Sequence, residues 1–114
     1  MLLLIGRVAF SANCSLNAGV DQTICSTATL TLTGDYAGLF PTPRVTTWSQ
    51  VSGPSAIITS PNSLITTVTG LIGAYTPGNV YKFRLTSTCE DGSLTFDEVN
   101  VTIVKITQPM LVSI

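Results

Sequence analysis

The residues that could do chemistry are few, and histidine is missing among them. The chain has 114 residues, with five lysines and arginines, six aspartates and glutamates, and no histidine. Histidine is the commonest general base and the commonest protein ligand of metals, so serine triads and zinc hydrolase sites of the usual kinds are excluded. Five basic residues are too few for a groove that contacts many phosphates. We therefore expect no catalytic residue, no cofactor and no nucleic-acid partner.

Three cysteines, Cys14, Cys25 and Cys89, are the most reactive side chains that remain. A metal site built from cysteine alone needs four of them, and a catalytic cysteine needs the histidine that is missing. At most one disulfide can form, with three alternative pairs and one thiol left over. Three reduced thiols, buried as small apolar groups, are the alternative if the protein stays in a cytoplasm.

Carboxylates gather late in the chain, at Glu90, Asp91, Asp97 and Glu98, with Asp21 as a further candidate. Loop carboxylates suit Ca²⁺, but the spacing of a calcium loop is absent, and the Asp-Gly step after Glu90 is typical of a hairpin turn. Paired carboxylates also serve glycoside hydrolysis, which needs a cleft with aromatic platforms. Most of the eight aromatic residues are needed for the core. We expect no metal site and no enzyme.

The elements that must position these residues are short β-strands. Threonine supplies 18 residues and charged residues only 10% of the chain, a composition that favours pleated, half-buried surfaces. Alternating apolar and polar residues between turn signals predict strands, and no window has helical periodicity. The expected strands are residues 2–10, 29–33, 45–51, 56–59, 64–69, 80–86 and 99–103. The expected core residues are Leu30, Leu32, Tyr81, Phe83, Leu85, Val99, Val101 and Ile103, together with Trp48.

Three segments, in order, resemble a known family. They are Asn-Ala-Gly-Val-Asp-Gln-Thr-Ile-Cys at 17–25, Trp-Ser-Gln-Val-Ser-Gly-Pro at 48–54, and Tyr-Lys-Phe-Arg-Leu-Thr at 81–86, running into Cys89. Over residues 15–104 they resemble the PKD-like (polycystic kidney disease-type) Ig-like modules, most closely those in large surface proteins of Bacteroidota bacteria. The resemblance implies an all-β, two-sheet sandwich of about seven strands with Trp48 in its core. It also implies a spacer or adhesive role outside the cell.

The resemblance favours a disulfide between Cys25 and Cys89, because these two cysteines tend to occur together in the family. Strand order argues differently. If Cys25 ends the first family strand and Cys89 the sixth, they lie at opposite poles, and Cys14 is nearer to Cys89. A disulfide needs Cα atoms within about 7 Å, so both arguments cannot hold. We take Cys25–Cys89 as the prediction, worth roughly 2–4 kcal/mol.

Two apolar ends extend beyond the part that resembles the family. We divide the chain into an N-terminal strand or assembly tail (1–13), the PKD-like sandwich (14–105) and a C-terminal strand or assembly tail (106–114). Arg7 is the single charge in the two tails, whereas a monomer normally guards such strands with charge. We expect the tails to contact neighbouring subunits; the alternative is two strands that cap the sandwich's own edges. No stretch approaches the roughly 20 apolar residues of a membrane span.

The loop of residues 35–44 is longer than the other turns and is expected to expose aromatic side chains near Arg44. Aromatic residues with arginine are typical anchors of interfaces. The alternative is a loop that folds back over one end of the core. With the two tails included, the expected interface residues are Leu2, Leu4, Val8, Phe10, Tyr36, Phe40, Arg44, Met110 and Leu111.

These observations predict a non-enzymatic structural surface module that self-associates in a larger assembly, with other protein subunits as partners: itself, or a shell or filament protein. Residues 1–12 make a poor export signal, so the preferred assembly is a virion formed in the cytoplasm. The protein would be a phage decoration, fibre or minor capsid protein, a use known for the Ig-like modules it resembles. The first alternative is an exported bacterial adhesin or filament subunit. The second is a carbohydrate-binding module using Tyr36, Phe40 and Arg44. The expected place is the extracellular face of a particle or cell.

Overall fold

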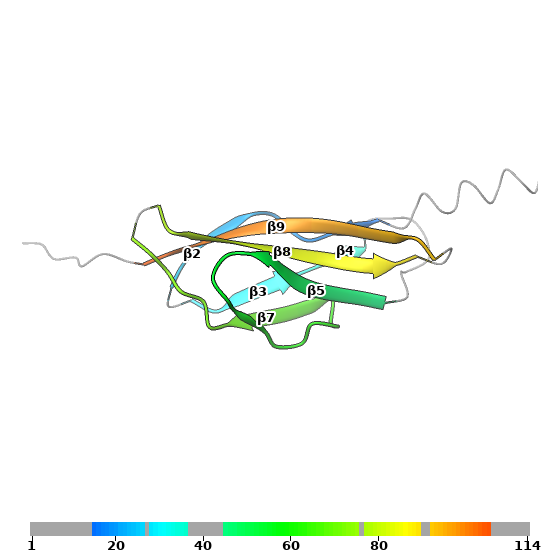
Figure 1. The fold of residues 1–114 in the computed structure, drawn as a ribbon, viewed down its shortest axis with the longest axis horizontal. Coiled ribbons are helices and arrows are strands. Elements are labelled where there is room, and N and C mark those ends of the chain that lie inside the picture. The colour runs from blue at the N-terminus through cyan, green and yellow to red at the C-terminus, as the bar shows by residue number, and fades with distance from the viewer. Residues whose placement is uncertain (1–14, 27, 37–44, 76, 90–91, 106–114) are drawn as a thin grey trace, which may run out of the picture.

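The computed structural model describes residues 15–26, 28–36, 45–75, 77–89 and 92–105, and β-strands are the regular elements in this part of the chain (Figure 1). Within these ranges no helix is long and apolar enough to cross a membrane. The all-β class expected from the sequence is confirmed. The nine described strands are β1 (Leu16–Asn17), β2 (Gln22–Cys25), β3 (Leu30–Thr33), β4 (Asp35–Tyr36), β5 (Val45–Ser52), β6 (Ile57–Ile58), β7 (Ile65–Thr69), β8 (Asn79–Thr88) and β9 (Leu94–Val104).

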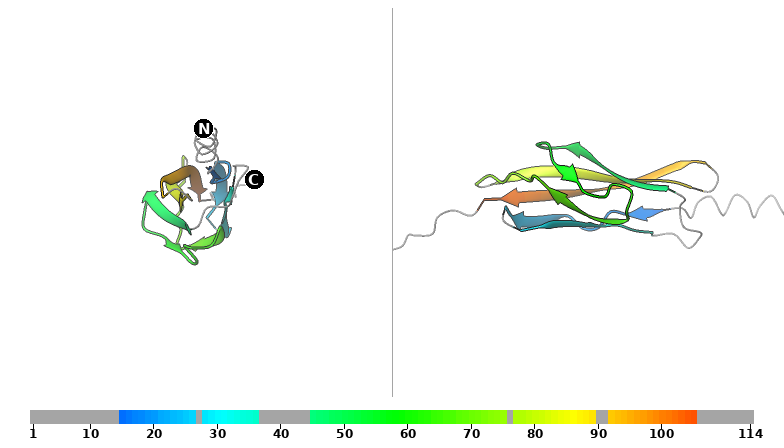
Figure 2. Two further views of the ribbon diagram at one scale, coloured as in Figure 1. Left: turned by 90° about the vertical axis from the view of Figure 1, so that its right-hand side faces the viewer. Right: turned by 90° about the horizontal axis from the view of Figure 1, so that it is seen from below.

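The strands form two main layers, which the end-on view of Figure 2 separates. One layer is a four-stranded sheet with the order β2–β9–β8–β5, and the other is a three-stranded sheet with the order β3–β7–β6. β1 and β4 pair with each other outside these sheets. β2 runs parallel to β9, whereas the other neighbours are antiparallel. This is the two-sheet sandwich that the sequence predicted.

A long hairpin of β8 and β9 runs the length of the sandwich. Its register is unbroken from Asn79 opposite Ile103 to Thr88 opposite Leu94. The hairpin closes where the Gly92 N–H donates to the C=O of Cys89 at 2.9 Å. Gly92 has a φ of +92°, a conformation that glycine adopts without a steric penalty. The glycine of the Asp-Gly step therefore lies where the sequence predicted a hairpin turn.

The core lies between the two layers and is filled by every second residue of the strands. All nine residues expected in the core are buried, each with an exposed fraction of 2% or less. The Trp48 indole N–H donates to the C=O of Leu64 at 3.0 Å, and the Tyr81 hydroxyl accepts the N–H of Ile72 at 2.7 Å. Both polar atoms are thus satisfied, as burial of tyrosine and tryptophan requires.

The N-terminal part of the sandwich changes layers between β1 and β2. β1 pairs with β4, whereas β2 pairs with β9 and does so only from Val101 onward. Gly19, with a φ of +93°, turns the chain, and its N–H donates to the Asn17 side chain at 2.9 Å. The Ala18 N–H donates to the Asp97 carboxylate at 2.8 Å. Among the described strands, the crossing therefore leaves none beside the outer edge of the first half of β9.

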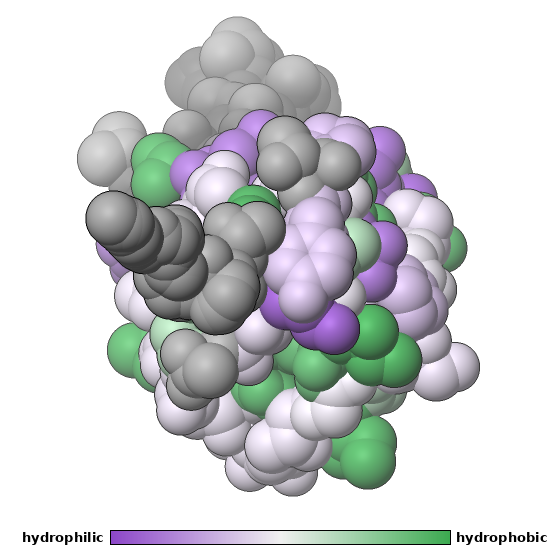
Figure 3. Space-filling view, turned by 90° about the vertical axis from the view of Figure 1, so that its left-hand side faces the viewer, coloured by the Kyte–Doolittle hydropathy of each residue, from purple (hydrophilic) through white to green (hydrophobic). Residues whose placement is uncertain are grey.

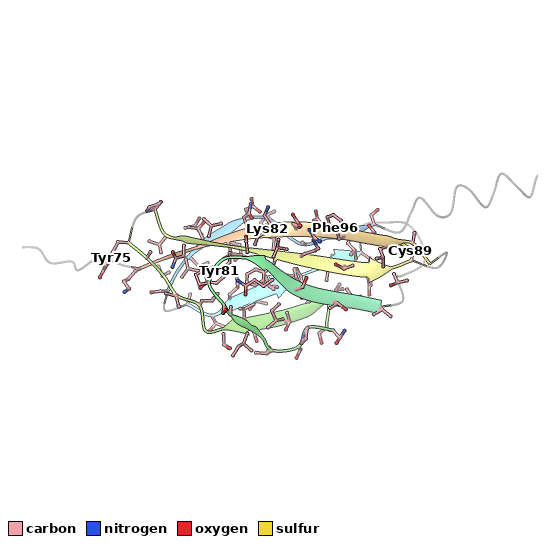
Figure 4. The ribbon with its side chains drawn as sticks, viewed as in Figure 1. Tyr75, Tyr81, Lys82, Cys89 and Phe96 are labelled. Carbon is pink, nitrogen blue, oxygen red and sulfur yellow. The ribbon has the colours of Figure 1, made fainter. Side chains whose placement is uncertain are left out.

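The disulfide predicted between Cys25 and Cys89 is wrong. Cys25 is a free, exposed thiol, whereas Cys89 is 3% exposed and disulfide-bonded. Cys25 lies opposite Val104 at one end of β9. The main-chain N–H of Cys89 donates a hydrogen bond to the C=O of Ser93 beyond the other end (Figure 4). The 11 residues of β9 between them span roughly 35 Å, far more than the 7 Å or so that a disulfide allows. The third cysteine, Cys14, lies outside the described residues.

Separate replacements should distinguish the two described cysteines. Cys89→Ser removes the disulfide and is expected to lower the free energy of unfolding by about 2–4 kcal/mol. Cys25→Ser alters an exposed thiol and should change it by less than about 0.5 kcal/mol. Urea unfolding under non-reducing conditions measures both values. Equal losses in the two variants would contradict this assignment.

Candidate interaction surface

The outer face of the four-stranded sheet carries three large apolar side chains at the end where Cys89 lies. Leu94 is 70% exposed, Phe96 56% and Val45 54%. The register brings them together, because Thr88 lies between Val45 and Leu94 across the sheet, and Phe96 follows two residues later on the same face. We name Val45, Leu94 and Phe96 the outer apolar patch. Figure 4 labels Phe96 and Cys89 in this region.

Arg84 lies beside this patch and connects it to a charged group. Its guanidinium carbon is 4.3 Å from the centroid of the Phe96 ring, and its Nε donates to Glu98 Oε2 at 2.8 Å. Lys82 Nζ lies 3.8 Å from the other carboxylate oxygen of Glu98. The two cations share one carboxylate, which leaves this group with one excess positive charge. At this exposure each ion pair is worth no more than about 1 kcal/mol, so the group orients side chains more than it stabilises the fold.

The surface suits a protein partner better than a small substrate. Aromatic and arginine side chains are enriched at the centres of protein interfaces, where they supply area and orientation together. Leu94 and Phe96 project outward from a sheet face, so they offer contact area without enclosing a ligand. A catalytic site would need convergent groups in a pocket from which water is excluded.

The carboxylates in the described ranges act one at a time. Asp21 accepts the N–H of Asn100 at 2.9 Å, Asp97 accepts the N–H of Ala18, and Glu98 holds the two cations of β8. No group of three or more carboxylates and cysteines that could hold a metal occurs in this part of the chain. Glu90 and Asp91 lie outside it. Asp21 and Asp97 fix the path of the chain between β1 and β2.

A shallow hollow of about 230 Å³ lies near the opposite end of the sandwich, between the loop after β2 and the end of β7. Its lining combines hydroxyl and small apolar side chains, without a charged or aromatic residue among the described ones. Figure 3 looks onto this end, where hydrophobic side chains lie among weakly polar ones. The hollow thus offers neither a titratable group nor an aromatic platform. The residues that line it are Ser26, Ala28, Thr29, Val68, Thr69, Gly70 and Leu71.

Among the interface residues expected from the sequence, the structure describes Tyr36, and it corrects the expectation there. Tyr36 is half-buried, packs against the core, and its hydroxyl lies 3.4 Å from that of Thr46. Because β4 pairs with β1, this ring covers one end of the core and is not an exposed anchor. The remaining interface candidates, Leu2, Leu4, Val8, Phe10, Phe40, Arg44, Met110 and Leu111, lie outside the described residues.

The outer apolar patch was not predicted from the sequence, although a signal for one of its residues, Phe96, was present. Lys82 and Arg84 alternate with the expected core residues of the strand at 80–86, and the structure places both on the outer face. Continuing that alternation through the hairpin turn would have placed Phe96 beside Arg84 on the same face. The strand expected at residues 99–103 was too short for this, since β9 begins at Leu94.

A double-mutant cycle should measure the contact between Arg84 and Phe96. We expect a coupling of about 0.5–1 kcal/mol between Arg84→Ala and Phe96→Ala in the free energy of unfolding, as for exposed cation–π pairs. The matched control combines Phe96→Ala with Lys82→Ala, whose side chain bonds to Glu98 instead. Urea unfolding of the single and double variants gives both couplings. Equal couplings in the two cycles would show that the Arg84 contact is not specific.

Comparison with known families gives one match that spans most of the sandwich. The family model described as "K319L-like, PKD domain" matches residues 18–103. The solution structure of the PKD domain from KIAA 1837 protein is similar with a TM-score of 0.72 and 25% identity, over 86% of this chain and 93% of that one. The solution structure of the PKD domain (329-428) from human KIAA0319 is similar with a TM-score of 0.67 and 18% identity, over 87% of this chain and 88% of that one.

A third similar structure is that of a much larger protein. The 2,6-sialyltransferase of Vibrionaceae Photobacterium sp. JT-ISH-224 matches with a TM-score of 0.56 and 14% identity, over 75% of this chain and 17% of that chain. At this identity the similarity concerns the fold alone. No curated protein is significantly similar to the chain in sequence.

Proposed function

The chain belongs to the K319L-like PKD domain family, and on this basis we propose that it is a non-catalytic structural module that self-associates in a larger assembly. PKD domains are in general non-catalytic, and they are typically extracellular modules of the adhesion type. The family thereby supplies the general class of function. This chain also has an exposed apolar surface through which copies could associate.

The outer apolar patch is the observation that supports self-association. Single exposed leucines are ordinary on protein surfaces, whereas neighbouring large apolar side chains more often mark an interaction site. Leu94, Phe96 and Val45 are each more than half exposed and lie on one face of three neighbouring strands, with Thr88 between Val45 and Leu94. The Arg84 guanidinium on Phe96 holds that ring in place, which lowers the entropic cost of binding.

The shape of the described sandwich supports an arrangement of modules end to end. Ala18 lies near the end of the hairpin, where its N–H bonds to Asp97, whereas Lys105 follows β9 at the other end. The two ends of the described chain therefore leave the body at opposite poles (Figure 1). A sandwich of this shape can act as a spacer between the partners at its two ends.

For the place of the assembly we propose a particle surface first, with the protein as a phage decoration, fibre or minor capsid protein. The alternative is a cell surface, with the protein as an adhesin or filament subunit. Both placements need an extracellular, non-catalytic sandwich that contacts other subunits, and they differ in what the module is attached to. A glycan as partner is the weaker alternative, because Tyr36, one of its three expected contacts, is half-buried.

Replacing the outer apolar patch should weaken self-association. We expect the Leu94→Ser, Phe96→Ser double variant to raise the dissociation constant at least about tenfold in sedimentation equilibrium, because both contact areas are lost. The matched control is Ile57→Ser with Ile65→Ser, since these side chains are 63% and 57% exposed on the other sheet. The control should associate like the wild type. A wild-type protein that stays monomeric at about 1 mM would overturn self-association, since even weak contacts saturate there.

Locating the native protein should separate the two placements. An antibody against the sandwich is expected to label purified particles, with the protein remaining attached through density-gradient sedimentation. Washed cell envelopes from uninfected cells of the same strain serve as the control. Label confined to those envelopes would reject the particle and support the cell-surface alternative.

A further inference from the structure

The first half of β9 presents an open strand edge directly beside the outer apolar patch. On one side of β9, the whole of β8 pairs with residues Leu94 to Ile103. On the other side β2 pairs only with Val101 to Val104. Residues 94–99 thus lack a neighbouring strand on that side within the part of the chain that the structure describes.

Hydrogen bonds at both ends of β9 establish which residues point toward the open edge. The Asn100 N–H donates to the Asp21 carboxylate at 2.9 Å, and the C=O of Val104 accepts the N–H of Ser26 at 2.9 Å. Both partners lie on the β2 side. The main-chain N–H and C=O groups of the even-numbered residues of β9 therefore point away from β8. The C=O of Ser93 accepts instead from Cys89, at the end of β8. Main-chain groups alternate in an antiparallel pair, and this register has no shift.

It follows that the N–H and C=O groups of Leu94, Phe96 and Glu98 point outward, away from β8. None of the described strands pairs with them. β1 lies close to β8 and β9, but it pairs with β4. The bond from Ala18 to the inward-facing Asp97 side chain places β1 beneath the sheet, which leaves the plane beside β9 open.

This edge lacks several of the features that usually protect an exposed strand. Residues 94–99 contain no proline or lysine, and no bulge interrupts them. The charge of Glu98 is balanced by Arg84 and Lys82, and the Asp97 carboxylate already accepts a backbone N–H. Both carboxylates of this edge therefore have partners within the monomer.

The edge of β5, at the other side of the same sheet, is protected by contrast. The main-chain N–H of Trp48 donates to the C=O of Pro61 at 2.7 Å, and the Asn62 side chain donates to the C=O of Thr46 at 3.3 Å. The loop after β6 thus covers that edge, so the two edges of the four-stranded sheet differ among the described residues.

We propose that this edge of β9 pairs with the same edge of a second copy of the chain, antiparallel about a two-fold axis through Phe96. The inference rests on the proposed self-association and specifies its surface. In this register Phe96 lies opposite its own counterpart, Leu94 opposite Glu98, and Thr95 opposite Asp97. Three N–H and three C=O groups of each copy are satisfied, and no like charges lie directly opposite each other. The four-stranded sheets of the two copies then form one continuous sheet of eight strands.

A second copy fits this edge because the edge is complementary to itself. A two-fold axis requires each residue pair to occur twice, which is how isologous dimers form. The aromatic pair at the axis and the leucines beside the glutamate stems add apolar contact to the main-chain bonds. The contact is smaller than the roughly 800 Å² per partner of stable complexes, so we expect weak, reversible pairing that an assembly would reinforce.

Proline tests the edge without disturbing the fold. Leu94→Pro removes an N–H that the monomer does not use, so we expect a native fold and a dissociation constant raised at least about tenfold. Leu94→Ala is the matched control, because it shortens the side chain and keeps the N–H. It should weaken pairing less than the proline does. Phe96→Lys, which keeps the main chain and adds a guarding charge, should also weaken pairing.

Hydrogen exchange gives a second readout within the wild-type protein. The amides of Leu94, Phe96 and Glu98 should exchange fast in dilute solution and slow down on concentration to about 1 mM. The amides of Thr95 and Asp97 bond to β8 and should be protected at both concentrations. This alternation identifies edge pairing, because contact through a sheet face would not select every second amide.

The outcomes separate this inference from the proposed function. Slower exchange at the three even-numbered amides on concentration, lost in Leu94→Pro, would support both. Association that leaves these amides fast, or that Leu94→Pro does not weaken, overturns edge pairing and leaves self-association standing. A protein that remains monomeric at about 1 mM by sedimentation overturns both.

Discussion

The two-residue alternation along the paired strands β8 and β9 sets the arrangement of both the core and the outer surface. Tyr81, Phe83 and Leu85 are fully buried against the other sheet. A slip of one residue would turn this whole row to solvent, so burial holds the register in place. The same register then decides which side chains face outward and which main-chain groups point to each edge. Core packing and the outer surface are therefore consequences of one pairing.

The crossing of the chain between β1 and β2 determines which part of that hairpin is covered. Two carboxylates hold the crossing, Asp97 at the N–H of Ala18 and Asp21 at the N–H of Asn100. β2 consequently reaches β9 only from Val101. The uncovered stretch coincides with Leu94 and Phe96, so the apolar patch and the open edge lie side by side. The self-association that we propose rests on this coincidence.

Much of the fold was predictable, because alternation is a local property. The buried positions of β3, β8 and β9 follow from their own alternating residues, and turn signals separate those strands. The disulfide was not predictable in this way. Cys25 and Cys89 tend to occur together in the family that the sequence resembles, yet β9 separates them by its full length. The outward position expected for Tyr36 failed similarly, since its pairing with β1 turns the ring onto the core.

The all-β class, the core residues and the outward positions of Lys82 and Arg84 follow from the sequence alone. These properties depend on neighbours a few positions away, which composition and period reveal. Three features depend on the tertiary structure: Cys25 is a free thiol, Phe96 lies beside the Arg84 guanidinium, and no described strand pairs with the outer edge of residues 94–99. Each of these depends on which distant strands become neighbours. Sheet order and the place where the chain changes layers set that arrangement, and no local pattern records them.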